Sequence, residues 1–493
     1  MSTVALRSQI LAHEKAAASL EPPAALRAEW QHGVDEVIAR FLDGLPGLAT
    51  YAPPSPMLRD EFDQAVSHHR DPGALLTQVS EALSRAGLQA AGPGHLAFVP
   101  GGGIYVGAIA DHFAAALNHF TADSFTAPIA TSIHNQAVSW LTAMVGYGDE
   151  AWGDITSGGT HATLTALTVA RNAHRLRPRD YERVCVYLTE HTHHCCHKVL
   201  DVIFGDAIVI RRVASRNHAM DTEALQEAIA QDRQQGLIPW LIVATAGSTH
   251  LGKVDDLEAI AAIAERFRLW LHVDAAYGGF FILCPERKAM LAGLSRADSI
   301  VLDPHKGMFL PYGCGAVLIK QGNLLRQAFG RGGAYLQDRT TDTERSPMDY
   351  SLELTRPFRA LRLWLALKVH GEEVFRRALQ EKLALARYTH ERLAGLPGLR
   401  MVGAPDLSIV AFSVEHPELE QANRQTRELL QRINRHPEAF LSSTLIDGRF
   451  VIRVAILSFR THLATIDALL ETITNELARL TLLEASTTRA GES

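Results

Sequence analysis

Residues 271–279, Leu-His-Val-Asp-Ala-Ala-Tyr-Gly-Gly, give the clearest indication of the fold. The apolar start predicts a short buried strand, and Asp274 stands where that strand ends. In open α/β sheets, ligands bind beside the carboxyl ends of the strands. The stretch therefore predicts a strand that brings a carboxylate to a ligand site, although an Asp at a strand end also serves as a helix cap or a hydrogen-bond anchor.

The same texture of short β-branched runs separated by helical windows begins at about Asp154. Strands are predicted at 154–156, 184–188, 207–210, 240–245, 270–273, 299–302 and 316–319. Helices are predicted between several of them, at 162–175, 222–234 and 257–267. This alternation is typical of a mostly parallel sheet flanked by crossover helices, so the fold class is α/β with seven candidate strands.

The flanking regions have other textures. Before the α/β pattern, helical spacing at 29–45 and 75–88 is interrupted by a proline segment at 51–57, and this opening looks too polar to form a core alone. After Gly371, a long helix, strand-like runs at 408–413 and 450–455 and a final helix at 466–483 indicate α+β structure. We expect a helical segment at 1–90 that packs on another surface, a large α/β domain at 91–370 and a smaller α+β domain at 371–493.

Composition excludes several classes of protein. The 493 residues include 48 Lys and Arg against 54 Asp and Glu, a formal charge of −6, which gives no basic surface for nucleic acid. No stretch approaches the ~20 apolar residues of a membrane helix, and Met1 to Lys15 lacks a secretory pattern. Five irregularly placed cysteines do not make a disulfide framework. We expect a soluble, cytoplasmic protein with no nucleic-acid or membrane partner.

Two further motifs suggest chemistry. Thr-Ser-Gly-Gly-Thr-His-Ala-Thr at 156–163 lies between a strand and a helix, where backbone N–H groups hold a phosphate, or it is a glycine turn capped by Thr160. Ser-Ile-Val-Leu-Asp-Pro-His-Lys-Gly-Met at 299–308 runs from a strand into a turn that carries Lys306. A lysine sheltered from water forms an imine with an aldehyde, whereas most lysines are solvated.

In their order and spacing, these motifs resemble the group II amino-acid decarboxylases, which depend on pyridoxal 5′-phosphate (PLP) and share the aspartate-aminotransferase fold, PLP fold type I. The resemblance covers roughly Gly94 to Glu476. It implies that Lys306 forms the imine with the cofactor aldehyde, that Asp274 binds the pyridine nitrogen and keeps it protonated, and that Ala276 touches the ring.

The resemblance also implies the rest of the cofactor site. His193, in the run 189–198, matches the histidine that stacks on the other face of the ring and approaches the substrate carboxylate. Gly159, Thr160 and His305 match residues at the phosphate. Thr245 matches a residue near the ring substituents. With Lys306, Asp274 and Ala276, these residues complete the expected PLP site.

Other matches concern the substrate. Tyr335 matches the mobile-loop tyrosine that protonates the α-carbon after carbon dioxide leaves, and the glycines at 330–333 suit a lid. Arg356 matches the arginine near the substrate carboxylate, or it belongs to an exposed helix start. His95, Phe98 and Pro100 match the substrate-facing segment, where an apolar wall favours an aromatic amino acid.

The expected reaction is therefore PLP-dependent decarboxylation of an L-amino acid. An aromatic amino acid is the first expectation for the substrate, followed by an acidic or a diamino acid. The resemblance further implies a homodimer with a shared active site, clasped by the N-terminal helices. Several positions depart from the family. Asp303 stands where the family usually has Asn, and Gly307 stands where it usually has an aromatic residue. Ser132 and His134 stand where it usually has acidic residues. These departures bear on the substrate more than on the cofactor.

Four alternatives stay open. A PLP-dependent aldehyde synthase is disfavoured by Tyr335, whereas an aminotransferase would need a carboxylate-binding arginine such as Arg453, which alternatively only flanks a strand. A carbon–carbon lyase is the third. The fourth is a metal-binding protein that uses the His/Cys run 191–197, in which His193 and His197 would share a helix face.

Overall fold

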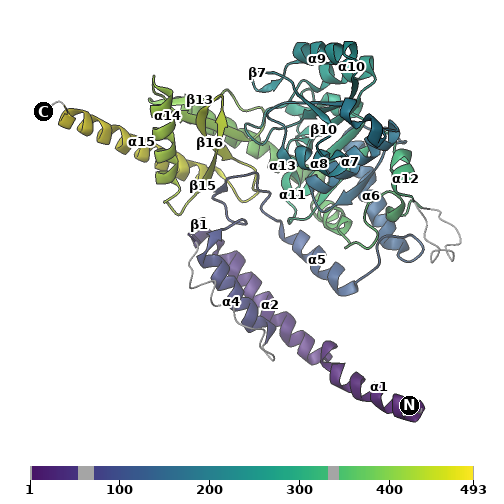
Figure 1. Cartoon of the computed structure of the whole chain (residues 1–493). Coiled ribbons are helices and arrows are strands. Elements are labelled where there is room, and N and C mark those ends of the chain that lie inside the picture. The colour runs from purple at the N-terminus through teal and green to yellow at the C-terminus, as the bar shows by residue number, and fades with distance from the viewer. Residues whose placement is uncertain (1–2, 54–70, 331–343, 492–493) are drawn as a thin grey trace. The chain divides into compact units, whose positions relative to one another are not determined.

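The computed structural model describes residues 3–53, 71–330 and 344–491, and they form two compact units, Met1–Gly92 and Pro93–Ser493. In the first unit, helices α2 and α4 pack along one another (Figure 1) and a short antiparallel pair, β1 and β2, joins Tyr51 to Leu88. Its elements are α1 (Thr3–Ala17), α2 (Ala24–Gly44), α4 (Pro72–Arg85), β1 (Tyr51–Ala52) and β2 (Gly87–Leu88). Neither α1 nor α2 buries a residue, which agrees with an opening too polar for a core of its own.

The second unit contains a seven-stranded sheet with the order β4-β12-β11-β10-β9-β5-β6. Its strands are β4 (Trp152–Thr156), β5 (Val184–Leu188), β6 (Val209–Arg212), β9 (Ile238–Thr245), β10 (Trp270–Asp274), β11 (Ser299–Leu302) and β12 (Gly315–Ile319). Strand β12 runs antiparallel to the other six strands, which are parallel to one another. The predicted α/β class with a mostly parallel sheet is confirmed, and the strand predicted at 207–210 lies two residues later, at Val209–Arg212.

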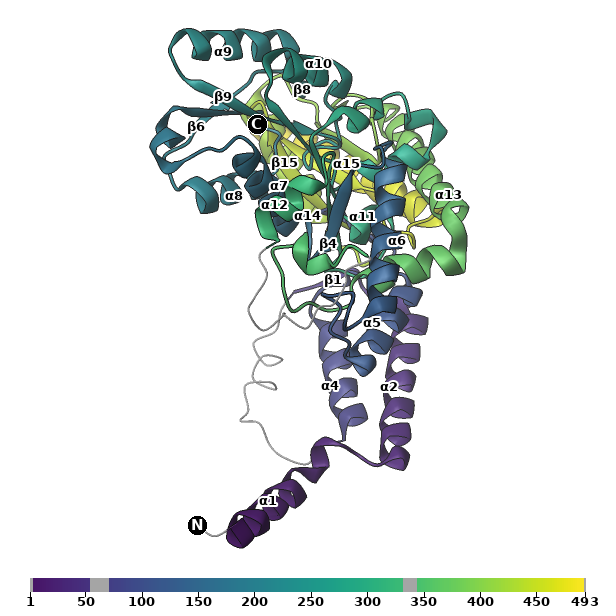
Figure 2. The same cartoon turned by 90° about the vertical axis from the view of Figure 1, so that its right-hand side faces the viewer.

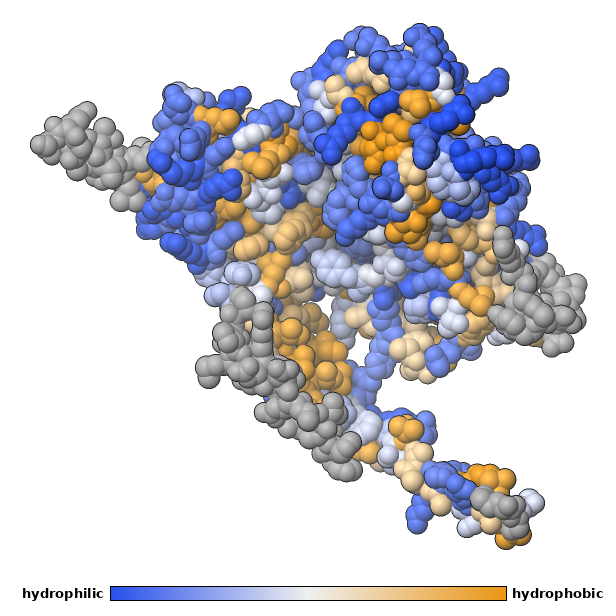
Figure 3. Space-filling model, viewed as in Figure 1, coloured by the Kyte–Doolittle hydropathy of each residue, from blue (hydrophilic) through white to orange (hydrophobic). Residues whose placement is uncertain are grey.

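Helices cover both faces of this sheet, which agrees with the burial of all residues of β10 and β11 and of six of the eight in β9. Figure 2 shows α6 and α7 on either side of β4. In Figure 3 the surface over α9 and α10 is mostly hydrophilic, because each presents only one apolar face to the sheet. The helices are α5 (Tyr105–Leu117), α6 (Pro128–Met144), α7 (Gly159–Ala173), α8 (His194–Phe204), α9 (Thr222–Gln234), α10 (Leu257–Phe267), α11 (Pro304–Gly307) and α12 (Asn323–Phe329).

A second sheet, of five strands in the order β13-β14-β16-β15-β3, has a separate hydrophobic core. Its strands are β3 (His95–Leu96), β13 (Leu399–Met401), β14 (Ile409–Val414), β15 (Phe440–Ile446) and β16 (Arg449–Ala455), and its helices are α13 (Ala360–Ala394), α14 (Leu419–Ile433) and α15 (Leu463–Gly491). A two-residue hairpin, β7 (Ser215–Arg216) and β8 (Ala219–Met220), lies outside both sheets. Helix α13 kinks at Gly371, whose φ of 72° favours glycine.

Two features of this sheet position the site. Strand β3 comes from early in the chain and pairs in parallel with β15, so that His95 lies opposite Phe440. The segment after β3 then approaches the turn that carries Lys306, because a Cβ on Gly101 would lie 2.2 Å from the carbonyl oxygen of His305. Within the described part of the chain, no helix is long and apolar enough to cross a membrane.

Candidate active site

Two neighbouring parallel strands bring polar side chains to one edge of the large sheet. Strand β9 ends at Thr245 and β10 ends at Asp274, and these residues are partners in the strand register. The carboxylate of Asp274 is buried, and its Oδ1 accepts a hydrogen bond from the backbone N–H of Ala276 at 3.1 Å. The hydroxyl of Thr245 is buried without a hydrogen-bond partner. A buried hydroxyl without a partner suits a site that binds a polar group.

Lys306 lies in the turn after the next strand, β11, on the short helix α11. Its Nζ lies 2.9 Å from Oδ2 of Asp303, which is itself buried. Burial opposes the charge on Lys306, but the carboxylates of Asp303 and Asp274 outweigh it and raise the pKa of the amine above its ordinary value. In this conformation the lysine is therefore held as a cation inside the site.

The neighbouring His305 is fixed by a hydrogen bond. Its Nδ1 lies 2.7 Å from the carbonyl oxygen of Cys314, and a carbonyl only accepts, so Nδ1 carries the proton. Burial lowers the pKa of His305, against the opposing effect of Asp303. The ring is therefore neutral near pH 7, with Nε2 3.6 Å from Oδ2 of Asp303.

The first turn of α7 lies beside Asp303 and His305. Helix α7 begins at Gly159, and Gly158 before it has a φ of 156°, a conformation that favours glycine. A Cβ at Gly159 would lie 3.1 Å from Oδ2 of Asp303, a tight contact that glycine avoids. Free N–H groups and the dipole of a helix N-terminus favour an anion, as a phosphate requires.

His193 caps the N-terminus of α8. Its Nδ1 accepts a hydrogen bond from the backbone N–H of Cys195 at 3.3 Å. The hydrogen bond with the Cys195 side chain raises the pKa of His193, against burial. Hydrogen bonds from Cys196 and His193 lower the pKa of the Cys195 thiol, although burial acts in the other direction.

These groups face one cavity of about 350 Å³. All eight residues expected to bind the cofactor line it: Gly159, Thr160, His193, Thr245, Asp274, Ala276, His305 and Lys306. They come from five separate strand ends and helix starts, those of α7, α8, β9, β10 and α11. The hydroxyl of Thr245, buried without a partner, and the N–H groups at the start of α7 fit a ligand that carries polar substituents and an anionic group.

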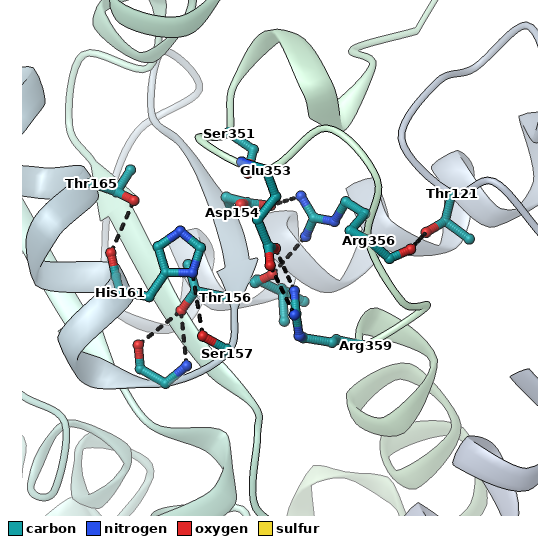
Figure 4. Close-up of polar contacts among 12 residues, drawn as sticks. Thr121, Asp154, Thr156, Ser157, His161, Thr165, Ser351, Glu353, Arg356 and Arg359 are labelled. Atoms are coloured by element: carbon teal, nitrogen blue, oxygen red, sulfur yellow. Dashed lines mark hydrogen bonds and ion pairs between the residues drawn. The ribbon is translucent and has the colours of Figure 1, made fainter. Parts of the chain in front are cut away.

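Arg356 lies elsewhere (Figure 4). Its Nη1 donates to Oδ1 of Asp154 and its Nη2 to the carbonyl of Ile155, both at 2.6 Å, and its side chain is 2% exposed. Both acceptors belong to β4, the strand that leads into the glycine turn before α7. The alternative of an exposed helix start is wrong, because the side chain is buried and donates to β4. Arg356 is not among the residues that line the cavity, and its contact with a substrate carboxylate stays a prediction.

Two departures from the family pattern find an explanation. His134 lies beside this ion pair, with Nε2 3.5 Å from Oδ1 of Asp154. Burial, followed by the charge of Arg356, lowers the pKa of His134 to about 3, so it stays neutral. Gly307 has no room for a side chain, because a Cβ there would lie 2.6 Å from the Cβ of Phe280.

The expected substrate-facing residues do not line the cavity. His95 and Pro100 are buried, and Phe98, which packs edge-on against His95, is 59% exposed. Tyr335 lies outside the described residues. Arg453, the alternative carboxylate ligand, is buried on β16 and donates to Ser442 Oγ and to the carbonyl of His250, both at 2.8 Å.

Sequence reasoning missed several residues that line the cavity. Cys195 was considered only as a metal ligand, and Asp303 only as a departure. Ser157, Gly158 and Tyr277 lie inside the motifs at 156–163 and 271–279, and their position in those motifs was the available signal. The hydroxyl of Tyr277 is committed to Ser408, with its oxygen 2.7 Å from Ser408 Oγ.

Comparison with known proteins identifies the family. Residues 54–415 match the pyridoxal-dependent decarboxylase conserved domain. The aromatic-L-amino-acid decarboxylase of Bacillus atrophaeus is 34% identical over 83% of this chain and 86% of its own. The phenylacetaldehyde synthase of Arabidopsis thaliana is 27% identical over 74% of this chain and 77% of its own. In structure, Oryza sativa TDC with PLP and tryptamine superposes with a TM-score of 0.88 at 24% identity, covering 93% of this chain and 99% of that one.

The chain therefore belongs to the pyridoxal-dependent decarboxylase family. It is a PLP-dependent amino-acid decarboxylase, and the predicted family, fold and cofactor are confirmed.

Proposed function

We propose that this enzyme decarboxylates an aromatic L-amino acid to its amine, in an active site that two copies of the chain share. The observation that carries the proposal is the single cavity in which Lys306, Asp274 and His193 meet the first turn of α7. The aromatic substrate is supported by the aromatic-L-amino-acid decarboxylase of Bacillus atrophaeus.

The residues would divide the work as follows. PLP supplies an electron-poor ring that accepts the electron pair left when carbon dioxide departs. Lys306 is the residue that would hold the cofactor covalently, and the first turn of α7 its phosphate. Asp274, as a buried carboxylate, would hold a proton on the ring nitrogen by the attraction of opposite charges. His193 would bind the substrate carboxylate and keep it perpendicular to the ring, which is positioning as catalysis.

Arg356 supports the site indirectly in this proposal. Its ion pair with Asp154 fixes β4, and β4 fixes the glycine turn that would hold the phosphate. We therefore propose Arg356 as a positioning residue. The buried ion pair is an anchor that keeps the N–H groups of α7 aimed at the cavity.

Tyr335 would return a proton to the α-carbon, which sends the reaction to the amine rather than to an aldehyde. Replacement Tyr335→Phe should lower amine yield and raise the share of aldehyde. Product analysis by chromatography measures the ratio, with Tyr388→Phe as the control because Tyr388 lies on α13 and does not line the cavity. An unchanged ratio in Tyr335→Phe removes this residue from the role.

The shared active site is supported by an apolar face on α5. Its exposed apolar side chains follow a spacing of four and so lie on one side of the helix: Tyr105, Ile109, Phe113 and Leu117. Phe98, Phe125 and Ile129 are exposed nearby in sequence. A second copy of the chain would bury this face and enclose the substrate-facing segment, with the N-terminal helices around the partner. A cytoplasmic location belongs to the same proposal, and the five buried free cysteines support it.

The test is a screen of the twenty amino acids with dopa, ornithine and diaminobutyrate, scored for released carbon dioxide and for amine against aldehyde. Aromatic amino acids should give amine and carbon dioxide in equal amounts. Preference for an acidic or diamino acid would overturn the proposed substrate, and aldehyde as the main product would overturn the proposed reaction in favour of an aldehyde synthase.

A further inference from the structure

Three metal-binding side chains meet inside the cavity, and only two of them are neighbours in sequence. The ligand atoms of His193, Cys195 and Asp274 all lie within 4.8 Å of one another. His193 and Cys195 come from the start of α8, and Asp274 comes from the end of β10. The fold therefore assembles an imidazole, a thiol and a carboxylate at one point.

This set of donors suits zinc. Zn²⁺ binds Cys sulfur at about 2.3 Å, His nitrogen at about 2.0–2.1 Å and carboxylate oxygen at about 2.0–2.2 Å, usually with four ligands in a tetrahedron. Tetrahedral ligands at these lengths lie roughly 3.3–3.8 Å apart, so small side-chain rotations close the site. The cavity beside the three residues leaves room for water as the fourth ligand.

Charge in the cavity also favours a cation. The lining contains two carboxylates, Asp274 and Asp303, and one lysine, Lys306. Lys306 is engaged with Asp303 at 2.9 Å, which leaves Asp274 to balance a second positive charge. The thiol of Cys195 would give its proton to solvent on binding the metal, as thiolate ligation requires.

We propose that His193, Cys195 and Asp274 bind a zinc ion when PLP is absent, and that zinc and PLP exclude one another. The exclusion rests on the proposed function, because it assigns His193 and Asp274 to the cofactor. A zinc-loaded chain would then be an inactive form that becomes active only after the metal is removed. The site differs from the one suggested by the run 191–197. Its third ligand, Asp274, lies at the end of strand β10, outside that run, and His197 is not part of it.

The experiment uses protein stripped of PLP. Zn²⁺ binding is measured by competition with a chromogenic chelator, and Cd²⁺ reports thiolate ligation through its ultraviolet absorption. We expect one ion per chain. Replacement Cys195→Ser removes a ligand and should weaken binding by more than the roughly 10–100-fold that loss of an outer-shell partner costs. His197→Ala is the matched control in the same helix and should bind as the parent does.

A second measurement tests the exclusion. Stripped protein preloaded with Zn²⁺ should not develop the visible absorption of bound PLP until a chelator is added. The control His197→Ala, preloaded with Zn²⁺ in the same way, should behave as the parent does. Cys195→Ser should take up PLP at the same rate with or without zinc. No zinc binding, equal binding by Cys195→Ser, or zinc binding to PLP-loaded protein would each overturn the proposal. Failure of the proposed function appears separately, as PLP-loaded protein that forms no amine.

Discussion

The cofactor cavity and the α5 face are built on opposite principles. In the cavity, polar groups from distant parts of one chain converge and are buried, with Lys306 paired to Asp303 and Thr245 beside Asp274. On α5, side chains such as Phe113, 54% exposed, are apolar and face outward. In the proposed enzyme, one chain supplies the cofactor residues and leaves an apolar surface that a second copy would cover.

The difference is also one of cost. Burying polar groups is unfavourable unless a partner or a ligand satisfies them, so the free oxygens of the cavity indicate a ligand. Leaving apolar side chains in water is unfavourable unless a partner covers them, so a continuous stripe indicates a protein surface. The four predictions below test each half of this comparison.

The largest effect is expected for Lys306→Ala, which removes the group that would hold the cofactor. Turnover should fall by more than about 1000-fold, as for loss of a residue that takes part directly in catalysis. Carbon dioxide release measures the change, and Lys198→Ala, an exposed lysine on α8, serves as the control. Residual turnover above a tenth of the parent value would contradict the role of Lys306.

A charge on the α5 face should break the pair of subunits. Burying one large apolar side chain contributes about 1.5–3 kcal/mol, and Phe113→Asp loses this on both copies, so association should weaken by at least about 100-fold. Light scattering should show that Phe113→Asp is a monomer, and this variant should have little activity. The control Val202→Asp, which changes an exposed residue on α8, should stay dimeric. A dimeric, active Phe113→Asp would remove α5 from the interface.

Breaking the ion pair beneath the cavity should destabilise the fold. Asp154→Asn leaves Arg356 buried without its counter-charge, and such a loss costs about 3–5 kcal/mol. Urea unfolding measures it. Glu373→Gln, in a mainly exposed pair with Arg377, should unfold at almost the same urea concentration as the parent. Similar losses in the two variants would contradict the anchoring role of Asp154 and Arg356.

The smallest effect is a shift in pH dependence. Because Asp303 helps to raise the pKa of Lys306, Asp303→Asn should let the amine lose its proton at lower pH. A lysine attacks an aldehyde as the neutral amine, so covalent loading of PLP should extend to lower pH in the variant. Loading followed by visible absorption measures the shift, with the exposed Asp206→Asn as the control. A shift to higher pH would contradict the account of this ion pair.

Much of the large sheet could be predicted from sequence because its strands are short apolar runs between turns. Strands 184–188 and 299–302 were predicted with both ends correct. Strands β13 and β15 were missed because most of their residues are only partly buried, so they show no clear apolar run. Strand β3 was missed because it has two residues and pairs with β15, far along the chain. Pairing of this kind leaves little local signal.

The candidate site divides in the same way. Lys306 and Asp274 lie in local sequence motifs, at 299–308 and 271–279, so the sequence alone indicated them as candidate site residues. The pairing of Arg356 with Asp154, and the approach of Cys195 to Asp274, join positions far apart in the chain. Only the folded chain brings such groups together, which is why the sequence did not indicate the pairing of Arg356 with Asp154 or the place of Cys195 in the cavity lining.

The most direct test of the central claim is to reduce PLP-loaded protein with borohydride and map the modified peptide by mass spectrometry. The account predicts one added pyridoxyl phosphate group per chain, on Lys306, with loss of the visible absorption band. Modification of a different lysine, or no modification of a protein that decarboxylates amino acids, would contradict it.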